Sequence, residues 1–161
     1  MGKIPRGTGL DPVNKFGFQL AKENFEYVET MHTSAGFGLL EQMGHIDFYP
    51  NGGSIQPCTC ITPCPDIDCE SDWKMKNDHN RAPAYFEESI LSSENFLAWK
   101  CKDLNLSPDD PHRSCPFEPF ESEIVPMGEW TTADGFPEGI FYLTTEGQSP
   151  FSCHGDDCFI P

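Results

Sequence analysis

The sequence predicts an α/β fold that is rich in loops and stapled by disulfides. Short extended segments alternate with turns and one helix, a pattern that favours part of an α/β fold over a β-sandwich. The 14 Gly and 15 Pro residues imply many turns and few long helices. The 8 cysteines, an even number, indicate a disulfide framework. At 161 residues, one domain is expected.

The first half of the chain is predicted to hold three short strands. Thr8 to Leu10 end the first strand at Asp11-Pro12, and Tyr27 to Met31 form the second. His45 to Tyr49 is a third candidate, and the turn cluster Pro50-Asn51-Gly52-Gly53 stops it. These segments are too short and too well separated by turns to be helices.

The best helix candidate is Ala84 to Leu91. Phe86 and Ile90 lie at positions i and i+4 and would share one face, whereas Glu87 and Glu88 would face water. Pro83 would then occupy the first turn, where proline is tolerated because its missing N–H needs no partner.

Loops and one last strand complete the chain. The segment Cys58 to Cys69 is rich in cysteine and proline and has no periodicity, so we expect a cross-linked loop. Residues 103–123 are polar, acidic and rich in proline, and are predicted to form a loop. Gly139 to Thr144 is predicted to be a strand with Phe141 and Leu143 on one face.

Charge and hydropathy exclude several classes of function. With 10 Lys plus Arg against 26 Asp plus Glu, the formal charge of −16 argues against binding to nucleic acid or to an anionic membrane surface. No run of about 18 apolar residues is present, so no transmembrane segment is expected. Cysteine content and the sequon at Asn105 favour an extracellular location. The first ten residues lack the apolar region of a signal peptide, which suggests a missing beginning.

A series of motifs runs through most of the chain. In chain order they are Gly9-Leu10-Asp11-Pro12, His32-Thr33-Ser34-Ala35-Gly36, Gly44-His45-Ile46-Asp47-Phe48-Tyr49-Pro50-Asn51-Gly52-Gly53, His79-Asn80-Arg81-Ala82, Tyr85-Phe86-Glu87-Glu88-Ser89-Ile90, Met127-Gly128 and Phe141-Tyr142-Leu143-Thr144. Together they resemble the pancreatic-lipase family, including its insect lipase and phospholipase A1-like members. The resemblance implies the C-terminal portion of an α/β-hydrolase fold. Residues 1–152 would be a partial lipase domain, and residues 153–161 a short cysteine-containing tail.

The same resemblance implies two members of a Ser-His-Asp triad. Asp11 would hold the imidazole of His79 in its productive tautomer, and His79 would act as general base and acid. In the α/β-hydrolase order the nucleophilic Ser precedes both, but no Ser precedes Asp11 and no G-x-S-x-G elbow occurs in the chain. Ser34 is interpreted as structural. This polypeptide alone is therefore not expected to hydrolyse esters.

Three explanations of the missing Ser stay open. A separate N-terminal lipase chain or segment would supply it, or the sequence is a truncated part of a longer lipase, or the protein is a non-catalytic relative. An isolated half of a parallel sheet exposes an unpaired strand, and this physical cost favours a partner segment. The starting Met favours instead a chain that is translated as it stands or a gene model that begins too late.

A lid-like loop at about residues 58–77 departs from the family pattern. Asn77 stands where the family commonly has a cysteine, so this lid would not be pinned there. Trp73 and Met75 either pack within the loop or contact lipid on an opened lid. Disulfides are expected among Cys58, Cys60, Cys64 and Cys69, and the resemblance implies Cys101 with Cys115; Cys153 with Cys158 would close a small tail loop. Four thiolates could also close a tetrahedral zinc site at the first four cysteines, but the extracellular context favours disulfides.

No metal or cofactor is implied. The stretch Gln19 to Asn24 has Ala21 and Asn24 where a family calcium site would need acids, so no such site is expected. His32 and His45 are predicted to form strand-end hydrogen bonds, and His112 and His154 have no identifiable task.

The sequence therefore supports two hypotheses. In the first, the chain is a component of a secreted lipase that hydrolyses carboxylic esters of acylglycerols or phospholipids, with Asp11 and His79 here and Ser elsewhere. In the alternative, it is a catalytically inactive lipid-binding or yolk-type storage protein on the lipase fold.

Overall fold

Six strands form one mixed sheet in the order β1-β2-β3-β6-β4-β5. The computed structural model describes residues 2–13, 20–57, 71–101, 123–132 and 135–153; within residues 71–76 only the backbone is described. In chain order the elements are β1 (Ile4–Leu10), η1 (Lys22–Asn24), β2 (Phe25–Met31), β3 (Ile46–Pro50), η2 (Asn51–Gly53), α1 (Ser71–Ser89), β4 (Leu97–Cys101), β5 (Ile124–Pro126) and β6 (Gly139–Leu143).

Strands β1, β2, β3 and β6 are mutually parallel, whereas β4 runs antiparallel to both β6 and β5. Leu10 pairs with Met31, and Met31 pairs with Phe48. Because neighbouring parallel strands end at the same edge of a sheet, the residues that follow β1 and β2 are brought side by side. This edge is where the polar motif residues gather.

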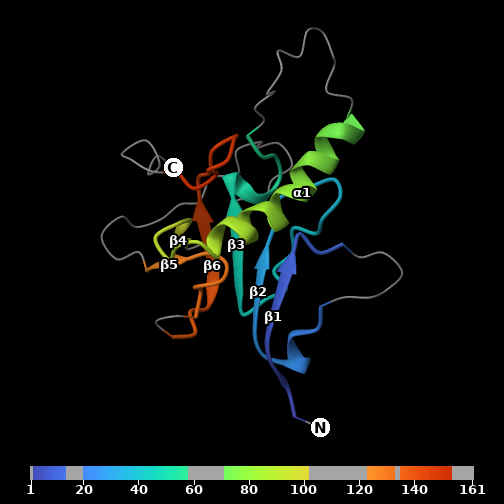
Figure 1. The fold of residues 1–161 in the computed structure, drawn as a ribbon. Helices are drawn as coiled ribbons and strands as arrows, with labels where there is room; N and C mark the ends of the chain where they lie inside the picture. The colour runs from blue at the N-terminus through green and yellow to red at the C-terminus, as the bar shows by residue number, and fades with distance from the viewer. Residues whose placement is uncertain (1, 14–19, 58–70, 102–122, 133–134, 154–161) are drawn as a thin grey trace, which may run out of the picture.

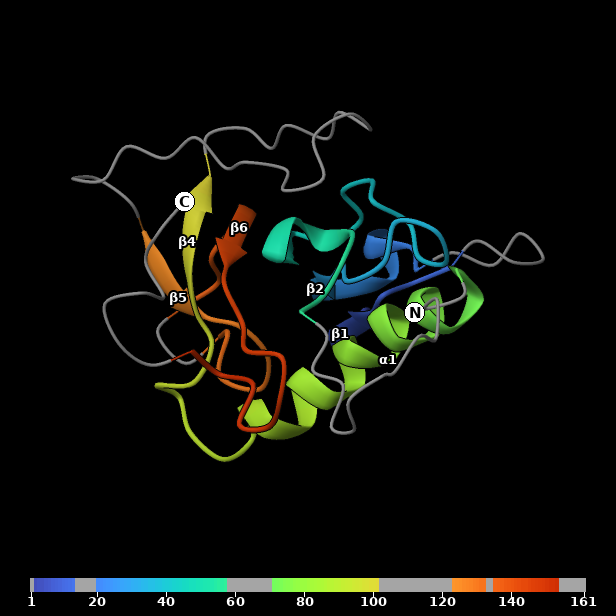
Figure 2. The ribbon, with the colours of Figure 1, turned by 90° about the horizontal axis from the view of Figure 1, so that it is seen from above.

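Helix α1 crosses one face of the curled sheet (Figures 1 and 2). Ala82 and Tyr85 of α1 are fully buried against strand side chains such as Met31, Phe48 and Phe141. The opposite face holds a smaller cluster around Tyr49 and Cys101. The main core thus lies between α1 and the sheet, and α1 is fixed against the sheet by these contacts.

The predicted α/β class and most predicted strands are confirmed. The segments ending at Leu10 and Met31 are β1 and β2, the segment at His45 to Tyr49 is β3, and the following turn is the 3-10 helix η2. Phe141 and Leu143 share the core face of β6, as predicted. Strands β4 and β5 were not predicted, and they extend the sheet beyond β6.

The predicted helix was too short at its beginning. Helix α1 starts at Ser71 and not at Ala84, so residues 71–77 of the predicted lid-like loop are helical, and Pro83 lies inside the helix. Glu88 does not face water: it is 8% exposed, and its carboxylate accepts hydrogen bonds from the backbone N–H groups of Phe151 and Ser152, both at 2.7 Å. Ile90, in contrast, is 51% exposed. The segments Cys58–Cys69 and most of 103–123 lie outside the described residues.

A buried carboxylate ties β1 to the rest of the sheet. Glu29 of β2 is fully buried and accepts hydrogen bonds from Arg6 and Thr8 of β1 and from Thr131. Arg6 also donates to the carbonyl oxygens of Gly128 and Glu129 at 2.7 and 3.0 Å. The network joins three segments that are far apart in the sequence. It also compensates the burial of the Glu29 charge, which would be unfavourable without these partners.

Buried tyrosines predict a loss of stability at alkaline pH. Burial raises the pKa of Tyr85 to about 12, and burial likewise raises the pKa of Tyr27 and Tyr142 above the usual range. The folded state thus favours the protonated phenols. This contribution is fully present below the unfolded-state pKa of about 10 and is lost as the pH rises through the folded pKa values.

We therefore expect the free energy of unfolding in urea to be lower at about pH 11.5 than at about pH 8.5. The Tyr142→Phe variant should show a smaller decrease, because one of the three perturbed phenols is removed. Equal decreases in the variant and the parent would mean that Tyr142 does not contribute.

Candidate functional site

Asp11 lies at the carboxyl end of β1, in a conformation that few side chains adopt. Its φ is +48°, in the left-handed region that Asp tolerates better than most residues. Its backbone N–H donates to the carbonyl of Met31 at 2.7 Å, and the residue is fully buried. The chain thus bends sharply at the strand end and places this carboxylate at the edge where β1 and β2 finish.

Backbone and hydroxyl donors surround the Asp11 carboxylate. Oδ1 accepts hydrogen bonds from the backbone N–H groups of Thr33 and Ser34 at 2.8 and 3.0 Å. Oδ2 accepts one from the Ser34 hydroxyl, whose oxygen in turn accepts the N–H of Gly38 at 2.9 Å. A Cβ at Gly38 would overlap the carboxylate, so glycine is required there. These hydrogen bonds fix the orientation of the Asp11 carboxylate.

His79 reaches Asp11 from helix α1. Its Nδ1 lies 2.7 Å from Asp11 Oδ2, and its side chain is 29% exposed. The ring packs against Phe37 with centroids 4.7 Å apart. Because an ionised carboxylate only accepts hydrogen bonds, the proton lies on Nδ1 and the lone pair lies on Nε2. Nε2 makes no hydrogen bond to a described residue, so this nitrogen can accept a proton from another group.

Ser34 is not placed to be a nucleophile. Its hydroxyl donates to Asp11, accepts from Gly38, and belongs to a residue only 1% exposed. This agrees with its structural interpretation. Among the described residues no serine hydroxyl bonds to His79, so the site that the structure describes is a His-Asp pair.

His32 and His45 form the strand-end hydrogen bonds that were predicted. His45 Nδ1 accepts the backbone N–H of Val28 at 2.9 Å. The buried ring of His32 bonds the Leu39 carbonyl through Nδ1 at 2.6 Å and Asp47 through Nε2 at 2.8 Å, and it stacks on Tyr49. His32 thereby ties the middle of the loop between β2 and β3, at Leu39, to Asp47 of β3.

Several predicted residues are placed only in part or not at all. Trp73 and Met75 belong to α1, but their side chains lie outside the described residues. Cys101 and Cys153 are each disulfide-bonded. The other cysteines, Cys58, Cys60, Cys64, Cys69, Cys115 and Cys158, lie outside the described part of the chain, as do His112 and His154, so the expected pairings stay predictions.

Sequence reasoning missed the contacts that hold the pair in place. Thr33, Gly38 and Phe37 were not singled out, although all follow directly after β2. The order of the motifs did contain this information. The neighbouring parallel strands β1 and β2 end just before Asp11 and just before His32-Thr33-Ser34, so the backbone N–H groups after β2 lie against the carboxylate after β1.

Over the described residues, no group of three or more His, Cys, Asp or Glu side chains is arranged to hold a metal ion. No helix in that part of the chain is both long enough and apolar enough to cross a bilayer.

A parallel sheet with a buried Asp at a strand end, hydrogen-bonded to a His from another element, is typical of hydrolases of the α/β class. Within that class the chain belongs to the lipase family, because the family model described as Lipase matches residues 1–151. This confirms the resemblance inferred from the motifs.

The similar proteins are pancreatic lipases and lipase-related proteins. The chain is 32% identical, over 94% of its length, to the pancreatic triacylglycerol lipase of Sus scrofa, of which it covers 38%. It is 33% identical, over 70% of its length, to the inactive pancreatic lipase-related protein 1 of Homo sapiens, covering 28% of that protein. It is 30% identical, over 94% of its length, to pancreatic lipase-related protein 2 of Cavia porcellus, covering 35%. The chain thus spans about a third of the relatives it matches.

Proposed function

We propose that this chain is the Asp- and His-bearing part of an extracellular lipase that hydrolyses carboxylic esters of acylglycerols or phospholipids. His79 takes the proton of a nucleophilic serine and returns it to the leaving alcohol, and Asp11 orients His79 and stabilises its charged form. The observation that carries the proposal is the 2.7 Å bond between His79 Nδ1 and Asp11 Oδ2, with Nε2 unbound by described residues.

The burial of the pair supports a catalytic role over a surface ion pair. Asp11 is fully buried and receives three hydrogen bonds besides the one from His79, whereas the His79 side chain remains 29% exposed. An orienting acid needs a fixed position, and a base needs access to the reacting group. The two residues meet these opposite requirements.

The serine is proposed to come from an N-terminal segment or partner chain. In the described part of the sheet β1 is an edge strand, paired only with β2. A parallel strand with one neighbour leaves a row of backbone N–H and C=O groups unpaired, and such strands normally lie inside a sheet. A further strand beside β1 would satisfy these groups and deliver its own carboxyl end next to Asp11, where a nucleophile elbow belongs.

Substrate class and location are extended from the relatives. One relative carries triacylglycerol lipase in its name, which supports an ester of glycerol as substrate. Phospholipid is the second candidate, from the phospholipase A1-like resemblance. Trp73 and Met75 are proposed as lipid contacts near the start of α1, and the eight cysteines as a disulfide framework suited to the extracellular space.

A catalytically inactive lipid-binding or storage protein is the second candidate. It is favoured by the absence of a G-x-S-x-G elbow from this sequence and by the similarity to an inactive lipase-related protein. The two candidates differ in one property: only the first has a serine that is activated by His79.

The test is labelling of the native protein that contains this chain with a fluorophosphonate, which reacts with activated serines. We expect a labelled serine in a segment or chain that precedes Asp11, and loss of labelling in the His79→Ala variant. Glu87→Ala is the matched control, because Glu87 is exposed on the same helix and bonds no described residue. Absence of labelling in the folded parent protein would reject the enzyme and leave the lipid-binding candidate, to be tested by flotation with lipid vesicles.

A further inference from the structure

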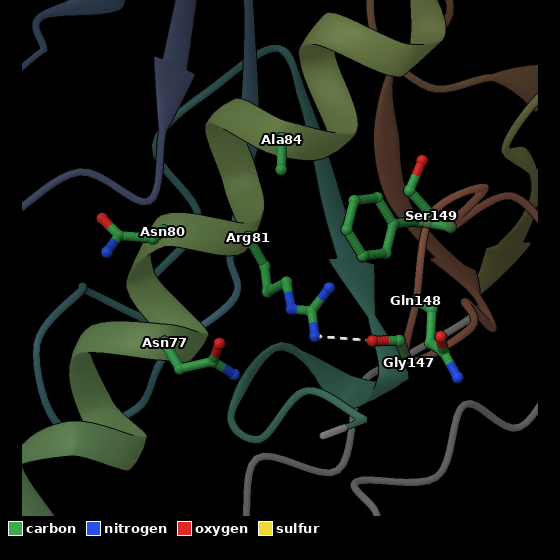
Figure 3. A pocket seen from close by; sticks show the side chains of 8 residues that line it. Asn77, Asn80, Arg81, Ala84, Gly147, Gln148 and Ser149 are labelled. Atoms are coloured by element: carbon green, nitrogen blue, oxygen red, sulfur yellow. Dashed lines mark hydrogen bonds between the residues drawn. The ribbon is translucent and has the colours of Figure 1, made fainter. Parts of the chain in front are cut away.

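A pocket of about 460 Å³ lies between helix α1 and the loop after β6, and the Asp11–His79 pair does not line it (Figure 3). Its lining side chains are mostly amides and small groups, namely Asn77, Asn80, Arg81, Ala84, Gly147, Gln148, Ser149 and Phe151. Positions 77, 80, 81 and 84 recur at helical spacing, so one face of α1 forms one wall. Position 81 follows His79 by two residues, which turns it to a different side of the helix.

Arg81 is the only ionisable side chain among the described residues that line this pocket. It is 8% exposed, and its guanidinium carbon lies 4.5 Å from the centre of the Phe151 ring. Its Nη2 donates to the carbonyls of Pro57 and Gly147 at 3.1 and 2.8 Å, the second of which is drawn in Figure 3. No described carboxylate forms an ion pair with it, although the chain has a net charge of −16.

Two buried donors in this pocket have no acceptor. Arg81 Nε and Asn77 Nδ2 are both buried and lack a hydrogen-bond partner. The amide group of Asn77 points toward the Arg81 side chain from the preceding turn of α1 (Figure 3). Burying a donor without an acceptor is unfavourable. Oxygen atoms of a bound anion would supply the acceptor that each of these donors lacks.

Two buried acidic residues of α1 have other partners. Asp78 Oδ1 accepts the backbone N–H of Gln56, and the Glu88 carboxylate accepts the N–H groups of Phe151 and Ser152. Among the described residues, Arg81 bonds two carbonyl oxygens and packs on the Phe151 ring, and it forms no ion pair. A negatively charged oxygen fits such a site better than a neutral one.

We propose that this pocket binds a small oxyanion, a carboxylate or a phosphate, whose oxygen atoms accept hydrogen bonds from Arg81 Nε and Asn77 Nδ2. Gln148 lines part of the remaining polar space, and Ala84 and Phe151 offer an apolar wall to the carbon part of an organic anion. The site does not depend on the hydrolytic function proposed above, because it uses neither Asp11 nor His79.

The test is a titration of the native protein with sodium acetate and, separately, with sodium phosphate at constant ionic strength. NMR signals of the Arg81 Nε–H and the Asn77 side-chain amide report on the two donors directly. We expect saturable shifts of both signals, and the anion with the lower dissociation constant identifies whether carboxylate or phosphate is preferred.

The Asn77→Asp variant supplies a carboxylate from within the chain, four residues before Arg81, and leaves both carbonyl bonds of Arg81 in place. We expect its anion affinity to fall by about tenfold or more and its melting temperature to rise by about 2–4 °C. Asn24→Asp is the control: it makes the same change of charge on the exposed 3-10 helix η1 and should alter neither property. The proposal is overturned if the parent shows no saturable shifts, or if Asn77→Asp binds the anions as tightly as the parent.

Discussion

Replacement of Asp11 by asparagine should lower kcat for ester hydrolysis about 10⁴-fold at neutral pH in the protein that carries the serine. An asparagine oxygen can still accept the N–H groups of Thr33 and Ser34, so its amide nitrogen must face His79. The amide donates, and His79 Nδ1 is then forced to accept. The ring proton then lies on Nε2. This is the nitrogen that should accept the serine proton, and in this tautomer it has no free lone pair.

Two measurements check this expectation. Hydrolysis of a soluble short-chain ester gives kcat, and the ¹⁵N chemical shifts of the His79 ring give the tautomer. The second needs no serine, so it can be made on this chain alone. Glu41→Gln is the matched control, because it neutralises an exposed carboxylate in the loop over Asp11 and should change neither quantity. Activity of Asp11→Asn within about tenfold of the parent would show that Asp11 does not set the tautomer.

Much of this site could be inferred from sequence because its parts follow parallel strands. Extended segments ending at Leu10 and Met31 were recognisable from local pattern, and the resemblance of the motifs singled out Asp11 and His79. The backbone donors around Asp11 follow from the parallel pairing of β1 and β2 with their ends in register, whereas His79 reaches the carboxylate from α1. Their catalytic role remains a proposal, but their placement within hydrogen-bond distance is observed.

The missed features all depend on partners far along the chain. Glu88 was predicted to face water because carboxylates usually do, yet it bonds backbone N–H groups of residues 63 and 64 positions later. Strand β5 has three residues, too few to show a period, and it exists only because β4 pairs with it. The early start of α1 was hidden by the polar stretch from Ser71 to Asn80, whose composition resembles a loop.

Arg81 illustrates the same limit at a candidate binding site. The motif His79-Asn80-Arg81-Ala82 marked the residue, but nothing in the sequence tells whether its guanidinium meets a carboxylate, a carbonyl or water. Only the folded positions of Pro57 and of the loop after β6 show that Nη2 is used by two carbonyls and that Nε is left without an acceptor.

Replacement of Glu29 by alanine should lower the free energy of unfolding by about 3 kcal/mol. Its carboxylate is fully buried and is the acceptor for Arg6, Thr8 and Thr131. Truncation removes the closest ion-pair partner of the partly buried Arg6 and the acceptor of the Thr8 hydroxyl. Arg6 keeps only the more distant carboxylate of Glu129, at 3.9 Å, and the Thr131 hydroxyl keeps the carbonyls of Pro126 and Gly128. Since Arg6 and Thr8 belong to β1, the strand that carries Asp11 loses its main polar attachment to β2.

Urea unfolding followed by circular dichroism gives the free energy for three variants. Glu29→Gln keeps the shape and one acceptor oxygen but loses the charge, so its loss should be smaller, about 1–2 kcal/mol. Glu26→Ala removes an exposed carboxylate from the same strand and should change stability by no more than about 0.5 kcal/mol. If Glu29→Ala were as stable as Glu26→Ala, the attachment of β1 would have to come from backbone pairing and apolar contacts alone. The Arg6 side chain, which is 26% exposed, would then be sufficiently hydrated without the Glu29 carboxylate.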